Sequence, residues 1–230
     1  MTTSSATAEQ PGFDIELHEA DKPIACLILG HGAGAGKEHE FMQAMATELV
    51  AKDISIVLFN FPYMQTIKAT GKRRPPDKAD KLMSHFTAVI ETCSKDNKAL
   101  HNLPVFIGGK SMGGRMATMV YEALSNVKGA IALGYPFHPP GKPEKTRTEH
   151  LQTASKPLLI IQGERDTFGT KSEVESYKKS GVLSSMIECA YLEDGDHSFK
   201  PRKASGKTQE QHIAKAATLT ASFIETNLNN

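Results

Sequence analysis

Six short apolar runs, most of them bounded by glycine or proline, constrain the fold of this chain more than any other feature. The runs lie at residues 23–30, 54–62, 103–109, 129–136, 157–163 and 185–193. Most are nearly continuous stretches of β-branched residues and leucine, a pattern typical of strands that are buried on both faces. We therefore expect these runs to form the interior strands of one sheet.

Between the runs lie stretches in which apolar side chains return at the spacing of an α-helix. The clearest cover residues 41–52, 80–93, 111–124 and 209–228. Strands that alternate with helices of this length predict an α/β protein, a three-layer α/β/α sandwich with a mostly parallel sheet. Residues 12–17 are expected to add an antiparallel edge strand.

Two segments are expected to be irregular, residues 63–78 and 137–150. Both follow strand C-termini, which form the edge where open α/β sheets bind ligands. Neither is long enough to form a lid domain, and no linker or internal repeat divides the chain. We predict a flexible segment at residues 1–12 and a single domain at residues 13–230.

The composition argues against several classes of protein. The formal net charge is +1 and 23% of the residues are charged, so neither nucleic acid nor a membrane surface is expected as a partner. No apolar run reaches the roughly 18–20 residues of a membrane span, and the polar start of the chain lacks the apolar core of a signal peptide. We expect a cytoplasmic protein that is monomeric or weakly dimeric.

Cys26, Cys93 and Cys189 are odd in number, far apart in the chain and mostly embedded in apolar segments. They are expected to be buried thiols of a reducing compartment and not a disulfide framework or a zinc site. We therefore predict no bound metal ion.

The glycine-rich segment GHGAGAG at residues 30–36 follows the first apolar run and raises the question of a nucleotide site. A phosphate-binding loop of the form G-x-x-x-x-G-K-[ST] would end at Gly36-Lys37. Its first glycine would then be residue 31, which is His31, and the residue after the lysine is Glu38 instead of serine or threonine. This pattern therefore fails at two positions.

The same segment matches the dinucleotide fingerprint G-x-G-x-x-A at Gly30, Gly32 and Ala35. That fingerprint also needs a carboxylate at the end of the next strand to bind the ribose, and the sequence has Asn60 there. We therefore expect no cofactor. A glycine turn without a ligand is the remaining alternative.

Residues Gly109-Lys110-Ser111-Met112-Gly113 form a G-x-S-x-G motif between an apolar run and a helical pattern. A sharp strand-to-helix turn of this kind lifts the serine hydroxyl above the sheet, and its glycines permit the crowded backbone. Gly113 and the next glycine also leave room for the helix to approach neighbouring strands. Ser111 is therefore the candidate nucleophile.

A serine hydroxyl needs a base to remove its proton, and the base needs an acid to orient it. For a serine in a G-x-S-x-G turn of this kind, we expect the acid and then the histidine later in the chain, on loops after later strands. Asp166 and His197 each lie just beyond an apolar run and follow Ser111 in this order. The alternatives are Glu164, Asp194 and Asp196 as the acid, and His31 and His138 as the base.

The segments GHGAGAG, GGKSMGGRMA, QGERDTFG and GDHSF resemble those of the α/β-hydrolase superfamily, in its dienelactone-hydrolase-like branch of small hydrolases without an assigned substrate. The resemblance covers nearly the whole chain after residue 20. It implies an α/β-hydrolase fold with eight strands or slightly fewer, a Ser111–Asp166–His197 triad and no cofactor. Dienelactone hydrolase itself has a cysteine nucleophile where this chain has Ser111, so its specific reaction is not expected. The lid insertion of many relatives is reduced here to residues 137–150.

These residues predict a serine hydrolase that cleaves small or short-acyl carboxylic esters through an acyl-enzyme intermediate. The oxyanion of the tetrahedral intermediate needs two N–H donors. We expect the amide of Met112 as one donor and the amide of Ala33 as the other, with Gly34 as the alternative to Ala33. A thioesterase or a serine peptidase would use the same machinery, and a binding or scaffold protein without turnover is the alternative from another class.

The candidates for the walls of the substrate pocket are aromatic residues near strand ends, two residues of the glycine segment and the residue before the motif serine. They are His31, Gly34, Tyr63, Lys110, Tyr135 and Phe137. Lys110 and the run Lys72-Arg73-Arg74 would favour an anionic substrate or an acidic partner, with solvated loop charges as the alternative interpretation.

Overall fold

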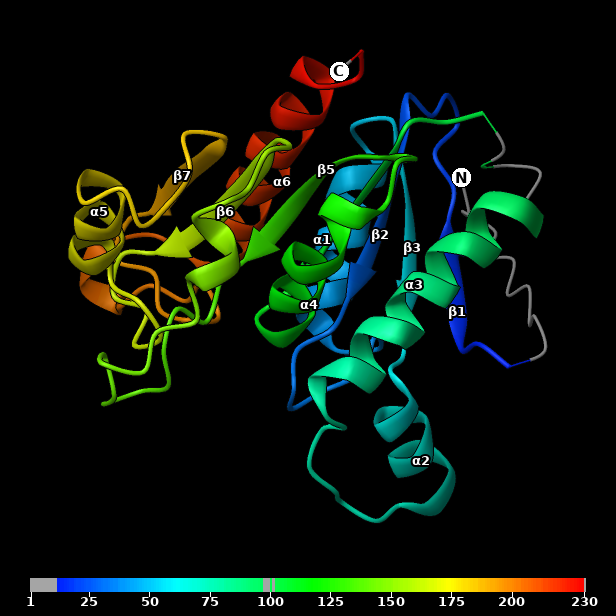
Figure 1. The fold of residues 1–230 in the computed structure, drawn as a ribbon, viewed down its shortest axis with the longest axis horizontal. Helices are drawn as coiled ribbons and strands as arrows, with labels where there is room; N and C mark the ends of the chain where they lie inside the picture. The colour runs from blue at the N-terminus through cyan, green and yellow to red at the C-terminus, as the bar shows by residue number, and fades with distance from the viewer. Residues whose placement is uncertain (1–11, 97–99, 101, 230) are drawn as a thin grey trace.

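The computed structural model describes residues 12–96, 100 and 102–229. Seven strands in these residues form one sheet through the middle of the molecule (Figure 1). The strands are β1 Ile15–His18, β2 Ala25–Gly30, β3 Ile54–Phe59, β4 Val105–Lys110, β5 Val127–Leu133, β6 Leu158–Gly163 and β7 Ile187–Leu192. Of the flexible segment predicted at residues 1–12, all but Gly12 lies outside the described residues.

The strand order is β1-β3-β2-β4-β5-β6-β7. β1 runs antiparallel to β3, with Ile15 opposite Phe59 and His18 opposite Ile56, and the other described pairs are parallel. The predicted fold class and the predicted antiparallel edge strand are therefore confirmed. Because the carboxyl ends of parallel strands lie at one edge of a sheet, the residues that follow β2, β4, β6 and β7 meet there.

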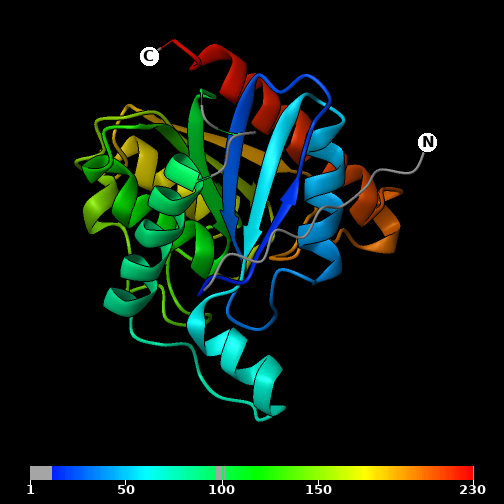
Figure 2. The ribbon, with the colours of Figure 1, turned by 90° about the vertical axis from the view of Figure 1, so that its right-hand side faces the viewer.

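The helices of the described residues cover both faces of the sheet. They are α1 Glu40–Val50, α2 Pro62–Thr70, α3 Ala79–Asp96, α4 Met112–Val120, α5 Lys171–Lys179 and α6 Gln209–Thr226. α1 and α6 lie on one face, and α3 and α4 lie on the other (Figure 2). None of these helices has both the length and the apolar composition to cross a bilayer.

The side chains of the buried strands alternate between two hydrophobic cores. In β2, Cys26 and Ile28 pack in the core with α3 and α4, whereas Ala25, Leu27 and Leu29 pack in the core with α1 and α6. This alternation is the period of two that a pleated strand imposes. Because both faces of the strand are covered, its sequence is apolar throughout.

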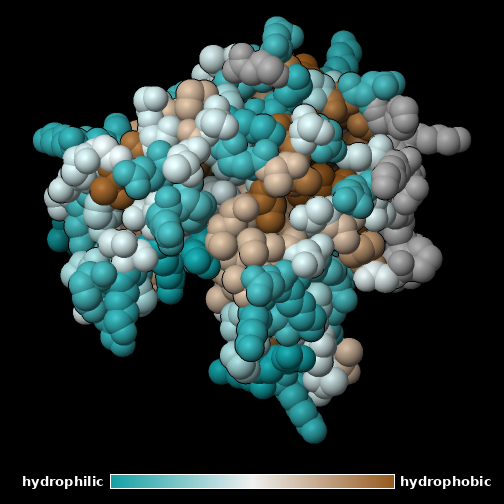
Figure 3. All heavy atoms as spheres, in the orientation of Figure 1, coloured by the Kyte–Doolittle hydropathy of each residue, from teal (hydrophilic) through white to brown (hydrophobic). Residues whose placement is uncertain are grey.

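Residues 62–70 form a helix, whereas the sequence pattern predicted irregular structure from residue 63 onward. α2 begins at Pro62, whose fixed φ suits the first helical position, and ends before Gly71, which has a left-handed conformation with φ 67°. These start and stop residues outweigh the weak apolar periodicity. α2 and the irregular segment after it project beyond the sheet and have a mostly hydrophilic surface (Figures 1 and 3).

Helix α5 has too little apolar periodicity to be predicted, because Val174 is its one buried residue. Its start is fixed by a capping box, in which Thr170 and Glu173 bond each other's backbone N–H groups. Residues 137–150, predicted to be irregular, contain only the beginning of the short 3₁₀ turn Glu149–Leu151. No lid domain is therefore inserted among the described residues.

Cys26 and Cys93 are buried, and Cys189 is partly exposed. Burial raises the pKa of the Cys26 thiol and raises that of Cys189 to about 11, so both stay protonated at neutral pH. Within the part of the chain that the structure describes, no three histidine, cysteine, aspartate or glutamate side chains are grouped so that they could hold a metal ion. Cys26 and Cys93 lie in the hydrophobic core, and Cys189 packs against it.

Gly113 allows α4 to cross close over β2. A methyl group at this position would lie 2.2 Å from the Gly30 carbonyl oxygen, which belongs to the backbone and cannot turn aside. We predict that Gly113→Ala lowers the free energy of unfolding by about 3 kcal/mol, as overpacking at a rigid contact does. Urea denaturation measures this change.

Gly34→Ala is the matched control, because no heavy atom lies within 4 Å of the added methyl group. Its free energy of unfolding should change by less than about 0.5 kcal/mol. Equal stability of the two variants would contradict this explanation of Gly113.

Candidate active site

Ser111 lies in the sharp turn between β4 and α4, with φ 52° and ψ −112°. Positive φ values are uncommon for residues other than glycine and carry backbone strain. The turn is held because the Ser111 N–H donates to the Leu133 carbonyl and the Arg115 N–H donates to the Ser111 carbonyl, each at 2.9 Å. The conformation raises the Ser111 hydroxyl at the carboxyl edge of the sheet.

The structure brings Ser111, Asp166 and His197 together from the ends of three strands. His197 Nε2 lies 2.9 Å from Ser111 Oγ, and His197 Nδ1 lies 2.7 Å from Asp166 Oδ2. A carboxylate accepts hydrogen bonds only, so the imidazole proton is assigned to Nδ1. Nε2 is then free to accept the hydrogen bond of the Ser111 hydroxyl.

The Asp166 carboxylate is fully buried and is hydrogen-bonded at both oxygens. Oδ2 accepts from Gln162 Nε2 at 2.9 Å as well as from His197, and Oδ1 accepts from the Phe168 N–H at 2.8 Å. The Phe168 ring also stacks on the imidazole, with ring centres 4.2 Å apart. Gln162 and Phe168 were not among the residues predicted from the sequence. The one signal for Gln162 was a polar residue at the end of an apolar strand.

The carboxylates considered as alternatives to Asp166 have other partners. Glu164 forms an ion pair with Lys171 at 2.8 Å, and Asp194 forms one with Arg165 at 3.0 Å. Asp196 accepts hydrogen bonds from two backbone N–H groups of the turn that follows it, at 2.8 and 2.9 Å. Asp196 therefore shapes the turn that carries the histidine and does not contact its ring.

His31 is fully buried and supports the glycine segment from behind. Nδ1 donates to the Gly32 carbonyl at 2.7 Å, and Nε2 accepts from the Phe61 N–H at 3.1 Å. Burial lowers the pKa of His31 to about 4, so the ring is neutral and has one donor and one acceptor, as these partners require. Tyr63 is also buried, and its hydroxyl donates to the Ala33 carbonyl at 2.9 Å.

Tyr135 and Phe137, predicted as pocket walls, are fully buried in the core. The Tyr135 hydroxyl donates to the Arg147 carbonyl at 2.7 Å, and the two aromatic rings pack edge to face. His138, the other histidine considered as a base, is buried with Nε2 3.3 Å from Glu173. All three side chains are buried, and none of them lines the pocket at Ser111.

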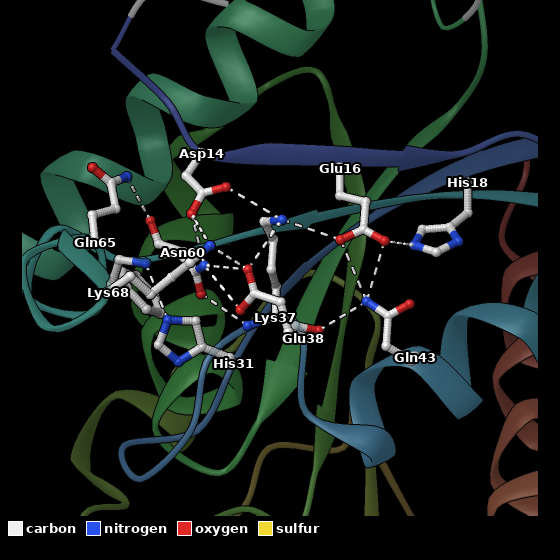
Figure 4. A network of polar contacts seen from close by, with 11 residues as sticks. Asp14, Glu16, His18, His31, Lys37, Glu38, Gln43, Asn60, Gln65 and Lys68 are labelled. Carbon is white, nitrogen blue, oxygen red and sulfur yellow. Dashed lines mark hydrogen bonds and ion pairs between the residues drawn. The ribbon is translucent and has the colours of Figure 1, made fainter. Parts of the chain in front are cut away.

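A cluster of ion pairs braces the far end of the glycine segment (Figure 4). Lys37 Nζ lies 3.1 Å from Glu16, 3.2 Å from Asp14 and 3.3 Å from Glu38. The Lys37 N–H donates to Asn60 Oδ1 at 2.8 Å. Asn60 occupies the position where a dinucleotide-binding protein would have its ribose-binding carboxylate. Here its side-chain oxygen accepts the hydrogen bond from the backbone N–H directly after the glycine segment.

Lys68 connects this cluster to α2. Its ammonium group pairs with Asp14 and Glu38, and the Asn60 amide donates to the same two carboxylates. Partial burial alone would raise the pKa of Glu38, but the hydrogen bonds from Lys68 and Asn60 and the charge of Lys37 lower it to about 2. Glu38 is therefore ionised at neutral pH, and the cluster ties the glycine segment to β1, β3 and α2.

A pocket of about 620 Å³ opens above Ser111 and His197. Its apolar lining includes Phe41, Met42 and Phe168, and the backbone of residues 32–35 forms one wall. Of the residues predicted to form the pocket, Gly34 and Lys110 line it. The structure places the other four, His31, Tyr63, Tyr135 and Phe137, in the core behind the site. Strand-end aromatic residues can point either way, and here they fill the core.

A family model described as an alpha/beta hydrolase domain matches residues 23–225. The chain therefore belongs to the alpha/beta hydrolase family, as its motifs indicated. The fold is similar to that of dienelactone hydrolase from Anabaena variabilis, with a TM-score of 0.71 and 16% identity over 99% of this chain and 98% of that chain.

Two further solved structures have similar folds. One is a serine hydrolase without a lid from Xanthomonas campestris, with a TM-score of 0.69 and 16% identity over 95% of this chain and 90% of that chain. The other is Est1E from Butyrivibrio proteoclasticus with ferulic acid bound, with a TM-score of 0.68 and 13% identity over 95% of this chain and 96% of that chain. At these identities the likeness establishes a shared fold, and the family together with its esterase-like neighbours supports hydrolase activity.

Proposed function

We propose that this protein is a serine hydrolase that cleaves small or short-acyl carboxylic esters through an acyl-enzyme on Ser111. The observation that carries the proposal is the 2.9 Å contact between His197 Nε2 and Ser111 Oγ. A hydroxyl is a poor nucleophile near neutral pH and reacts when a positioned base removes its proton. The Asp166 contact at 2.7 Å supplies the group that orients this base.

The reaction proceeds in two acyl transfers. His197 Nε2 takes the proton of Ser111 as Oγ attacks the ester carbonyl, and Asp166 stabilises the imidazolium. The imidazolium then gives the proton to the leaving alcohol as the C–O bond breaks. In the second transfer His197 takes a proton from water as the water oxygen attacks the acyl carbonyl. The imidazolium then returns the proton to Ser111 Oγ as its bond to the acyl carbon breaks and the carboxylic acid leaves.

Two backbone amides are proposed to bind the oxyanion. Met112 is the first residue of α4, and the first N–H groups of a helix have no partner within it. Gly32 passes so close that a methyl group on it would lie 3.8 Å from Ser111 Cβ, which supports Ala33, the next residue, as the second donor. Among the described backbone hydrogen bonds outside helices and strands, none uses the Ala33 N–H. Gly34 is the alternative donor.

The open pocket supports a preference for small esters. No lid covers it among the described residues, so little surface is available to bury a long acyl chain. The apolar side chains Phe41, Met42 and Phe168 suit a short acyl group or a small aromatic one. A thioesterase or a serine peptidase would use the same contacts, whereas a scaffold protein would have no use for a base aligned on Ser111.

Hydrolysis of p-nitrophenyl acetate, butyrate, octanoate and palmitate tests this function. We expect the highest kcat/KM for acetate and butyrate, and a loss of about 10³-fold or more in Ser111→Ala. Ser180→Ala, which changes an exposed serine at the end of α5, should keep wild-type activity. Highest activity on palmitate, or full activity in Ser111→Ala, would contradict the proposal. Faster hydrolysis of a thioester or a peptide would favour the alternatives.

The oxyanion donors predict a second result. Ala33→Pro removes the N–H of residue 33, and loss of one such donor costs about 10²–10³-fold in kcat. Ala33→Gly keeps the N–H and should be at least about 10²-fold more active than Ala33→Pro. Equal kcat values in the two variants, measured on p-nitrophenyl butyrate, would exclude the Ala33 amide and leave Gly34 as the donor.

A further inference from the structure

Lys110 is the last residue of β4 and directly precedes Ser111. Its side chain is partly buried and lines the pocket, although lysine is usually exposed. Lys110 Nζ donates to the backbone carbonyl of His197 at 2.6 Å. This contact joins the residue beside the nucleophile to the backbone of the proposed base.

The path of the Lys110 side chain is enclosed by packed groups. Nζ lies 5.6 Å from the centre of the Phe41 ring and 5.7 Å from that of Phe199, and these two rings pack edge to face. A methyl group on Gly134 would lie 2.8 Å from Nζ, so a side chain at that position would displace the ammonium. Among the described residues no carboxylate lies within 4 Å of Nζ, and the His197 carbonyl is its close polar partner.

We propose that Lys110 is a positioning residue, whose ammonium group ties the His197 backbone to the strand that carries Ser111 and thereby sets the approach of Nε2 to Oγ. The proposal rests on the proposed function. Hydrogen bonds from a charged donor are stronger and shorter than neutral ones. A displacement of about 1 Å between reacting groups can cost about 10²-fold in rate, so a tether of this kind has a measurable effect.

The charge of Lys110 depends on its surroundings. Burial lowers its pKa to about 8, although Asp166, after β6, and Asp196, after β7, favour the charged form. The imidazole of His197 and the rings of Phe41 and Phe199 also lie near the ammonium. Above about pH 8 the ammonium loses a proton, and the remaining N–H donors make a weaker, uncharged hydrogen bond. kcat should therefore step down above this pH to a lower plateau and not to zero.

The test compares Lys110→Met with the wild type, since methionine has a similar length and no N–H. We expect kcat on p-nitrophenyl butyrate to fall about 10²-fold with KM nearly unchanged, and the step near pH 8 to disappear. Lys215→Met is the matched control, because the exposed Lys215 also donates to a backbone carbonyl, that of Tyr191, away from the site. It should keep the wild-type kcat and pH profile.

Chemical restoration separates the charge of Lys110 from its packing. Lys110→Cys alkylated with 2-bromoethylamine regains an ammonium group of nearly the same length, and we expect it to regain most of the lost kcat. Wild-type protein treated in the same way controls for reaction at other cysteines. No gain in kcat after alkylation, or an unchanged kcat and pH profile in Lys110→Met, would overturn the proposal.

A readout that needs no turnover distinguishes this proposal from the proposed function. In protein with ¹⁵N-labelled histidine, the proton on His197 Nδ1 should give a resolved resonance in the wild type and an exchange-broadened one in Lys110→Met. An identical resonance in both proteins would overturn the positioning role even in a protein without esterase activity. Absence of Ser111-dependent hydrolysis in the wild type would instead overturn the proposed function.

Discussion

The hydrogen bond between the Asp166 carboxylate and His197 Nδ1 is the contact on which the rest of the site depends. A buried carboxylate must be compensated by hydrogen bonds, and Gln162, the Phe168 N–H and the imidazole supply them. This arrangement assigns the imidazole proton to Nδ1 and leaves Nε2 as the acceptor that faces Ser111. It forms because the carboxyl ends of β4, β6 and β7 lie at the same edge of the sheet, with β5 between β4 and β6.

The features that follow from strand order could be predicted from the sequence. Continuous apolar runs identify strands covered on both faces, and their alternation with helices fixes a parallel sheet. In such a sheet, residues just beyond the strands lie at one edge. The G-x-S-x-G motif and the positions of Asp166 and His197 after later strands predicted that these residues would meet Ser111, and the structure places the three side chains in contact. Directly after the glycine segment, Lys37 pairs with carboxylates of this chain.

Features that depend on which way a side chain points could not be predicted. Tyr63, Tyr135 and Phe137 follow strands within a few residues. An aromatic ring there can face the pocket or the core with the same local sequence, and all three are buried. α2 was missed because capping residues define it and apolar periodicity does not. The contact of Lys110 with the backbone of His197 joins residues far apart in the chain, and no sequence motif predicts it.

The most direct test of the central claim is the site at which the protein reacts with a fluorophosphonate, located by peptide mass spectrometry. A base aligned on Ser111 predicts a single adduct on the peptide that carries this residue. It also predicts that the rate of adduct formation in His197→Gln is lower by at least about 10³-fold, because the hydroxyl then lacks its proton acceptor. An adduct on another residue, or equal rates in the two proteins, would contradict the account.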